Sequence, residues 1–272
     1  MITGASDGLG AEFARQSARE GFNLVLVSRT ESKLQKLAEE LSSKYQIKCE
    51  IVAMDCSANR DADFAKLKAV TDKIEIRVLI NNVGQSHDIP VEFAHSDLKE
   101  LDSIISINCE ATLKITHLLL PRLKMAKGRA LILTMGSFAG LTPVAMLATY
   151  SASKAFLAQW SGALEIELAK SKEYRHIEAK LINSYLVCSA MSKIKRPSFL
   201  IPSATTFVKS AVNKIGGWPH THGAMTPYWQ HAIYQYIIGI APTKVVDDIS
   251  YSSHVNIRER ALRKIARNQK SQ

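Results

Sequence analysis

Cysteine is scarce and dispersed in this chain: Cys49, Cys56, Cys109 and Cys188 form no CxxC pair. This pattern favours reduced packing residues in an intracellular setting over a disulfide framework or a metal site. Long apolar runs are also missing, since no window approaches the roughly 18 consecutive apolar residues of a spanning helix, and no signal peptide opens the chain. The sequence itself therefore predicts no metal centre and no clear spanning helix.

Acidic residues are few in the last third. The net charge is +10 overall, and residues 190–272 alone hold 12 lysines and arginines against 3 aspartates and glutamates. No recognition-helix, zinc-finger or RNA-binding signature accompanies this charge, so we expect no nucleic-acid partner. We interpret the excess as a solvated basic face, or as a surface that attracts anionic lipid headgroups or a phosphate-bearing substrate such as an acyl-CoA.

What the sequence does have is an alternation of short β-branched runs and amphipathic helical patterns. Strands are predicted at 23–28, 48–55, 77–81, 130–134 and 179–183, and helices at 11–20, 31–45, 96–127 and 151–170. Near-continuous apolar strands separated by helices predict a parallel sheet covered on both faces, which is a doubly wound, Rossmann-type α/β fold. We expect a single domain over 1–272. Residues 1–190 would form the cofactor-binding and catalytic core, and 191–272 a substrate lid, an apolar segment and a basic tail.

The apolar segment 228–241 reads YWQHAIYQYIIGIA. It is too short to cross a bilayer, so we interpret it as a core or lid helix, or as a segment in the headgroup layer, which tryptophan and tyrosine favour. The basic residues of 258–270 predict a solvated, frayed helix, or one that lies on an anionic membrane.

A glycine-rich turn, Thr3-Gly-Ala-Ser-Asp-Gly-Leu-Gly10, precedes a helix and then a strand. Glycines allow a sharp turn and a close approach of the backbone to a pyrophosphate, and the helix N-terminus offers free N–H groups. In this context the turn predicts a dinucleotide site. Its expected cofactor-binding residues are Gly4, Ser6, Gly8, Leu9 and Gly10.

Arg29 directly follows the second strand, where NAD enzymes commonly place an acidic residue for the ribose 2′-hydroxyl. An arginine suits the 2′-phosphate of NADP by charge and by its forked donors, so we predict NADPH as the cofactor; the alternative is an ordinary surface arginine. Asp55 ends the third strand, and we expect it to accept a hydrogen bond from the adenine amino group or, alternatively, to cap a helix.

Tyr150 and Lys154 share one face at the start of a helical pattern. A free tyrosine, with a pKa of about 10, is a poor acid–base catalyst at neutral pH, and a neighbouring ammonium is expected to lower that pKa. Ser137, at a strand end, is expected to hold a substrate carbonyl oxygen. Tyr150 and Lys154 alone are also compatible with a surface helix pair, but all three residues downstream of a dinucleotide turn predict a ketone reductase.

Together these motifs resemble the classical short-chain dehydrogenase/reductase family over nearly the whole chain. Asn81-Asn-Val-Gly84 resembles the family's strand end beside the adenosine ribose, which adds Asn82 and Gly84 to the expected cofactor site. Asn108 matches the family's helix asparagine, which holds a proton-relay water. The resemblance implies catalytic roles for Ser137, which orients the ketone, for Tyr150, the general acid in reduction, and for Lys154, which holds the nicotinamide ribose and tunes the tyrosine.

A narrower resemblance is to the fungal very-long-chain 3-oxoacyl-CoA reductases. It is carried by TGASDGLGAEFARQSAREGFNLVLVSRT, NNVGQSHDIPVEF, LTMGSFAGLTPVAMLATYSASKAFL and MTPYWQHAIYQY. It implies NADPH-dependent reduction of a very-long-chain 3-oxoacyl-CoA in fatty-acid elongation, at the endoplasmic reticulum membrane with the active site facing the cytosol. It further implies an acyl-CoA substrate, that membrane and the other elongation enzymes as partners, and it allows a homo-oligomer.

The chain departs from the family pattern at two places. The family has Pro-Gly after the sixth strand, where this chain has Ser184-Tyr185, so Val187 and Ser189 are expected to make the nicotinamide contacts. The family also has a membrane anchor and a full first strand before the turn, where this chain has only Met1 and Ile2. We expect the anchor and most of that strand upstream of Met1, and a sheet that began there to lose its middle strand.

Two other functions fit the same residues. Related animal proteins include hydroxysteroid reductases, so the substrate could instead be a steroid or another hydrophobic ketone. A short first strand is also compatible with an inactive scaffold of an elongation complex.

Overall fold

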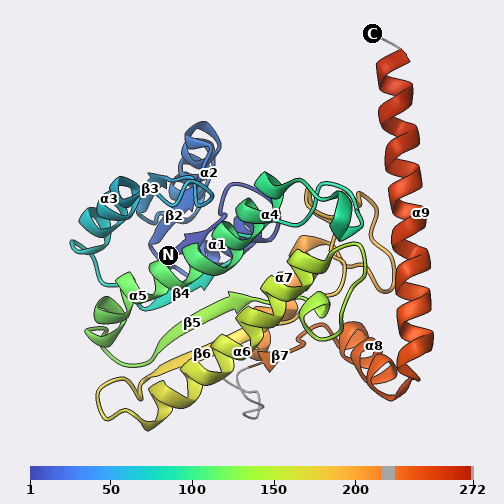
Figure 1. Cartoon of the computed structure of the whole chain (residues 1–272). Coiled ribbons are helices and arrows are strands. Elements are labelled where there is room, and N and C mark those ends of the chain that lie inside the picture. The colour runs from blue at the N-terminus through green and yellow to red at the C-terminus, as the bar shows by residue number, and fades with distance from the viewer. Residues whose placement is uncertain (216–223, 271–272) are drawn as a thin grey trace.

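The computed structural model describes residues 1–215 and 224–270. Within them the strands are β1 (Ile2–Thr3), β2 (Leu24–Ser28), β3 (Cys49–Ala53), β4 (Val78–Asn81), β5 (Ala130–Met135), β6 (Ile177–Ile182) and β7 (Ala224–Met225). They form one parallel sheet in the order β3-β2-β1-β4-β5-β6-β7 (Figure 1). The strand order reverses between β1 and β4, which is the switch point of a doubly wound sheet. The predicted fold class is confirmed.

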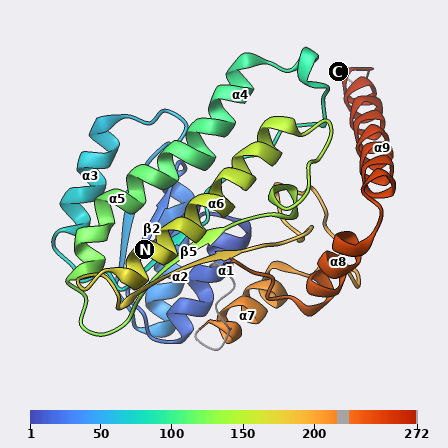
Figure 2. The ribbon, with the colours of Figure 1, turned by 60° about the horizontal axis from the view of Figure 1, so that its bottom comes forward.

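Helices cover both faces of the sheet (Figure 2). The α-helices of the described residues are α1 (Gly8–Arg19), α2 (Glu31–Tyr45), α3 (Asp61–Thr71), α4 (Leu98–Ile105), α5 (Ala111–Lys124), α6 (Ala148–Lys170), α7 (Ala204–Lys214), α8 (Trp229–Ile240) and α9 (Thr243–Lys270). One apolar core joins the sheet to α1, α2 and α7 and includes Phe13 and Phe207. A second core joins it to α3, α5 and α6 and includes Leu67 and Ile115. The helices named in these two cores bury apolar side chains against the sheet, as their sequence patterns predict.

The first strand is short, as expected, but it still holds the middle of the sheet. Ile2 pairs with Leu26 of β2 on one side and with Ile80 of β4 on the other. The carbonyl of Met1 extends this ladder by accepting a hydrogen bond from the N–H of Ile80, at 2.9 Å. The expectation that the sheet would lose its middle strand is therefore wrong, because two residues bonded along both edges are enough to bridge β2 and β4.

The helical stretch expected at 96–127 is confirmed from Leu98 to Lys124, and it contains a π-helical turn in its middle. α4 ends at Ile105, a π-helical turn occupies Ser106–Glu110, and α5 begins at Ala111. Such turns add one residue to a helical turn and frequently occur at functional sites. Here the turn contains Asn108, whose side chain is completely buried.

The C-terminal helix α9 stands along one side of the molecule and extends beyond it (Figure 1). The guanidinium of Arg258 ties it to the body by donating to the carbonyl of Pro90, at 2.7 Å. The helix predicted at 258–270 is confirmed as the second half of α9. No helix in the described part of the chain combines the length and the apolar character needed to cross a membrane.

Candidate active site

The predicted site residues follow the carboxyl ends of neighbouring parallel strands. The glycine-rich turn follows β1, Asn82 follows β4, Ser137 follows β5 and Val187 follows β6. Because the strands are parallel, these segments meet along one edge of the sheet, at and beside the switch point. Ligands of doubly wound sheets bind at this edge, so the structure places the predicted residues where such a site is expected.

Close packing forces glycine at the turn after β1. Gly4 has a φ of +63°, and a Cβ added at Gly10 would lie 2.1 Å from the carbonyl oxygen of Gly4. Asp7 caps the N-terminus of α1 by accepting a hydrogen bond from the N–H of Gly8, at 2.7 Å. The turn therefore brings the start of α1 directly against the end of β1, with the partly buried Ser6 and Leu9 beside it.

Asn82 braces this turn from the neighbouring strand. Its side-chain Nδ2 donates to the carbonyls of Thr3, at 3.0 Å, and Gly4, at 3.3 Å. In return the Thr3 hydroxyl accepts from the N–H groups of Asn82 and Val83, each at 3.0 Å. Sequence reasoning assigned Asn82 to the cofactor and did not single out Thr3. In this structure both residues fix the backbone that would face a pyrophosphate.

Ser137, Tyr150 and Lys154 are brought together where β5 meets α6. The ammonium of Lys154 lies 5.9 Å from the centre of the Tyr150 ring. It is buried and donates to the carbonyl of Met135, the last residue of β5, at 2.8 Å. The residues after Ser137 form a 3₁₀ turn, Phe138–Gly140. This turn packs so tightly on α6 that a Cβ at Gly140 would lie 2.6 Å from the backbone carbon of Lys154.

Burial shifts the pKa values of both Tyr150 and Lys154. It raises the pKa of Tyr150, and a hydrogen bond with Ser137 opposes the rise only in part. Burial also lowers the pKa of Lys154 to about 8. The expected lowering of the tyrosine pKa is therefore not found in the protein alone, because the loss of hydration outweighs the hydrogen bond with Ser137. The phenol is protonated at neutral pH, as a proton donor must be.

Asn108 lies beside these residues in a satisfied hydrogen-bond network. Its Oδ1 accepts from the N–H of Gln85, at 2.8 Å, and its Nδ2 donates to the Gln85 carbonyl, at 2.9 Å, and to the hydroxyl of Ser153, at 2.8 Å. The Ser153 hydroxyl in turn donates to the carbonyl of Tyr150, at 2.7 Å. The predicted Asn108 thus contacts α6 through Ser153, a residue that sequence reasoning missed although it directly precedes Lys154.

Gly84 lies where Asn108 and Lys154 approach each other. A Cβ at this glycine would lie 3.3 Å from Oδ1 of Asn108 and 3.6 Å from the ammonium of Lys154. A cavity of about 570 Å³ opens next to this network. Among its lining residues are Gln85 and Arg258, so it lies between the loop after β4 and α9.

The remaining predicted cofactor residues lie around the turn. Arg29 is exposed directly after β2. Asp55 accepts from both the N–H and the hydroxyl of Ser57, at 3.0 and 2.7 Å. It therefore caps a turn and not helix α3, which begins after Arg60. Ser189 lies over the glycine turn, with its Cβ 3.6 Å from the position of a Cβ at Gly8.

Val187, the other residue expected near the nicotinamide, is buried in the core that contains α1 and α7. Beyond it, an aromatic wall that sequence reasoning did not foresee borders Ser137. Phe138 stacks on Tyr234 of α8 with 6.1 Å between ring centres, and Tyr185 meets Tyr234 edge to face at 4.8 Å. Burial and the neighbouring Tyr234 raise the pKa of Tyr185 to about 12, so this phenol does not ionise near neutral pH. Tyr234, from the inner side of the apolar segment 228–241, therefore forms one side of the candidate substrate region.

Comparisons with known proteins agree with this geometry. A family model described as short chain dehydrogenase matches residues 1–198. The very-long-chain 3-oxoacyl-CoA reductase of Kluyveromyces lactis is 49% identical over 283 residues, which cover 100% of this chain and 80% of that protein. The reductase of the same name from Aspergillus oryzae is 50% identical over 274 residues, which cover 98% and 78%.

The fold also matches solved structures. A short-chain dehydrogenase from Sphingobium yanoikuyae, solved in complex with NADPH, has a TM-score of 0.71 at 23% identity, over 89% of this chain and 95% of that one. At this identity the likeness shows the fold. With the family model and the two fungal relatives, it leads to one conclusion: the chain belongs to the short-chain dehydrogenase family.

Proposed function

We propose that the protein is an NADPH-dependent reductase that converts a very-long-chain 3-oxoacyl-CoA into the 3-hydroxyacyl-CoA during fatty-acid elongation. The observation that supports it most is the partly buried, protonated Tyr150 beside Ser137, with the Lys154 ammonium 5.9 Å from the ring centre. The names of the fungal relatives supply the substrate class.

The residues around the turn fit a nicotinamide dinucleotide. The N-terminus of α1 begins at the glycine turn, where Gly8 and Leu9 are only partly buried, and it suits a pyrophosphate. The exposed Arg29 suits a 2′-phosphate. Lys154 uses one donor on Met135, and an ammonium has three, so two remain for ribose hydroxyls. When bound, NADPH would supply the hydride for the ketone carbon.

The chain itself would handle the proton. Ser137 donates a hydrogen bond to the ketone oxygen, and the Tyr150 hydroxyl transfers its proton to that oxygen, which becomes the product hydroxyl. The phenolate left behind is stabilised by Lys154, which is predominantly an ammonium at neutral pH because its pKa is about 8. Asn108, held by Gln85 and Ser153, would use the second lone pair of its Oδ1 to hold a water that returns a proton toward Lys154 and Tyr150.

Turnover on two substrates tests the substrate class. We expect NADPH oxidation with a long-chain 3-oxoacyl-CoA to have a much higher kcat/KM than with a steroid ketone of similar hydrophobicity. Preference for the steroid would replace the acyl-CoA assignment by the hydroxysteroid alternative. The scaffold alternative predicts that NADPH produces no thermal stabilisation, whereas a competent site shows a shift that grows with ligand concentration.

A further inference from the structure

The outward side of α8 consists of apolar and aromatic side chains. Trp229, Ile233, Tyr236, Ile237 and Ile240 are each more than half exposed. Their spacing of three and four residues places them in one line along the helix, called here the α8 stripe. A surface helix of a soluble protein normally carries charged residues on this side, so a continuous apolar line marks an interaction surface.

Charged residues are absent from this part of the sequence. From position 224 to 243 the chain contains no Asp, Glu, Lys or Arg. Phe199, which is 66% exposed, widens the stripe, because its ring meets that of Trp229 edge to face with 5.6 Å between centres. The surface therefore combines one apolar helix face with an aromatic side chain from a distant part of the chain.

The body of the protein holds α8 with this stripe facing outward. On the inner side, His231 is fully buried, accepts from the N–H of Tyr185 at 3.3 Å and bonds the carbonyl of Leu200 at 2.9 Å. Burial lowers the pKa of His231, which keeps the ring neutral and suited to both bonds. Tyr234 stacks on Phe138 on the same inner side. The two sides of α8 thus have different roles, and rotation of the helix to bury the stripe would break these contacts.

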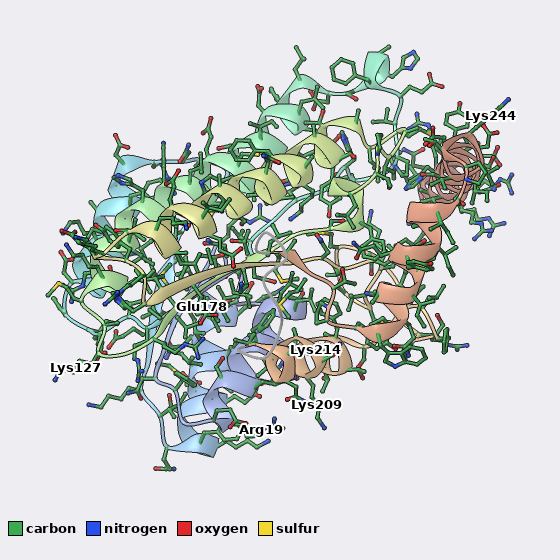
Figure 3. The ribbon with its side chains drawn as sticks, turned by 90° about the horizontal axis from the view of Figure 1, so that it is seen from below. Arg19, Lys127, Glu178, Lys209, Lys214 and Lys244 are labelled. Atoms are coloured by element: carbon green, nitrogen blue, oxygen red, sulfur yellow. The ribbon has the colours of Figure 1, made fainter. Side chains whose placement is uncertain are left out.

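Basic residues border the stripe. Lys195 and Arg196 precede Phe199, and Lys244 follows α8; all three are exposed. Figure 3 shows Lys244 at the α8–α9 end of the molecule, far from Lys127. Asp247 and Asp248 follow in the first turns of α9, and exposed Arg260, Arg263, Lys264 and Arg267 lie further along this helix, away from α8. A second copy docked on the stripe would bring like charges together, whereas anionic headgroups would neutralise them.

We infer that the α8 stripe lies in the headgroup layer of an anionic lipid bilayer. The 12 residues of α8 extend only about 18 Å, against roughly 30 Å for the hydrocarbon core, so the helix lies along the surface. Tryptophan and tyrosine prefer this layer, and the basic border adds electrostatic attraction. The aromatic wall beside Ser137 is then one helix away from lipid, so an acyl chain would enter beside α8. That consequence rests on the proposed reductase function; the lipid contact does not.

Vesicle flotation of the full chain tests this surface. We compare wild type with Ile233→Glu/Ile237→Glu on phosphatidylcholine vesicles with and without phosphatidylserine. The control is Leu98→Glu/Met125→Glu, which adds the same charge at two exposed apolar positions outside the stripe. Thermal melting verifies that all variants fold. Quenching of Trp229 by brominated lipid, corrected with Trp229→Phe, reports its insertion.

The lipid surface predicts that wild type and control bind phosphatidylserine vesicles at least tenfold better than neutral ones, and that salt weakens this binding. The stripe variant should lose binding at least tenfold while keeping its turnover of a water-soluble, short-chain 3-oxoacyl-CoA. Equal vesicle binding by the stripe variant would overturn the inference. The inference would also be overturned if the wild-type protein did not bind vesicles but formed a dimer, and the stripe variant were monomeric. Neither result would affect the proposed reductase function. If the wild-type protein shows no turnover of the 3-oxoacyl-CoA, the reductase function is refuted, and the lipid contact is unaffected.

Discussion

Asn108 and Ser153 share a hydrogen bond of 2.8 Å across the buried contact between the π-helical turn and α6. The same serine donates to the carbonyl of Tyr150. This bond links the loop after β4, through Gln85, to the first turn of the helix that carries Tyr150 and Lys154. The π-helical turn therefore places the side-chain amide of Asn108 within hydrogen-bond distance of both the loop after β4 and helix α6.

Replacing Asn108 by alanine should lower the free energy of unfolding by about 1–3 kcal/mol, because the N–H and carbonyl of Gln85 would lose their partner. Denaturant titration measures this change. Asn256→Ala, at an exposed position of α9, is the matched control and should change stability by less than about 0.5 kcal/mol. Equal stability of the two variants would show that the network contributes nothing to the fold.

Lys154 should give stability a characteristic pH dependence. Its pKa is about 8 in the folded protein against a usual 10.5, so between these values the unfolded chain binds more protons and stability rises with pH. Relative to Lys154→Met, wild type should gain about 2 kcal/mol from pH about 7 to about 9.5. Urea titrations of both proteins at several pH values test this. Parallel curves would mean that the ammonium is not buried as described.

Gly10 and Gly239 should respond oppositely to alanine. A Cβ at Gly10 would lie 2.1 Å from the carbonyl oxygen of Gly4, whereas a Cβ at Gly239 would meet nothing within 4 Å. Gly10→Ala should therefore destabilise the protein and abolish NADPH binding in calorimetry. Gly239→Ala, within α8, should raise stability by about 0.5–1 kcal/mol through helix propensity. Normal NADPH affinity in Gly10→Ala would contradict the proposed role of the turn.

Arg29→Ala tests the choice of NADPH. Loss of a charge-assisted pair with the 2′-phosphate is worth about 1.5–3 kcal/mol, so NADPH affinity should fall roughly 10- to 100-fold while NADH affinity stays nearly constant. Arg19→Ala, at the far end of α1, is the control and should change neither affinity. Equal losses for both nucleotides in Arg29→Ala would assign Arg29 to the shared part of the cofactor or to folding.

The sheet and its two helical layers could be predicted because their signals are local. Apolar runs at 24–28 and 130–135 are long enough to identify buried strands without knowledge of their neighbours. β7 has only two residues and exists because it pairs with Leu181 and Ile182, so its own sequence carries no signal. The middle strand likewise survives at two residues through pairing on both sides, which the expectation from its length could not anticipate.

The site was predictable by residue type and less so by environment. Ser137, Tyr150, Lys154 and Asn108 are brought together as expected. The pKa of Tyr150 depends on burial by segments far apart in the chain, and local spacing says nothing about that. The aromatic wall joins Phe138 to Tyr234, a contact that only the folded chain creates. Ser153 was missed because a serine inside a helix usually indicates no more than a tolerated polar residue.

The most direct test of the account is a single-turnover measurement with Tyr150→Phe. The enzyme, saturated with NADPH, is mixed with a long-chain 3-oxoacyl-CoA, and NADPH oxidation is followed beside wild type and Tyr251→Phe, which alters an exposed tyrosine of α9. We predict that Tyr150→Phe loses at least about 10³-fold in rate, within the usual contribution of a general acid, and still binds NADPH with nearly wild-type affinity. A Tyr150→Phe rate within a few-fold of wild type would contradict proton donation by Tyr150.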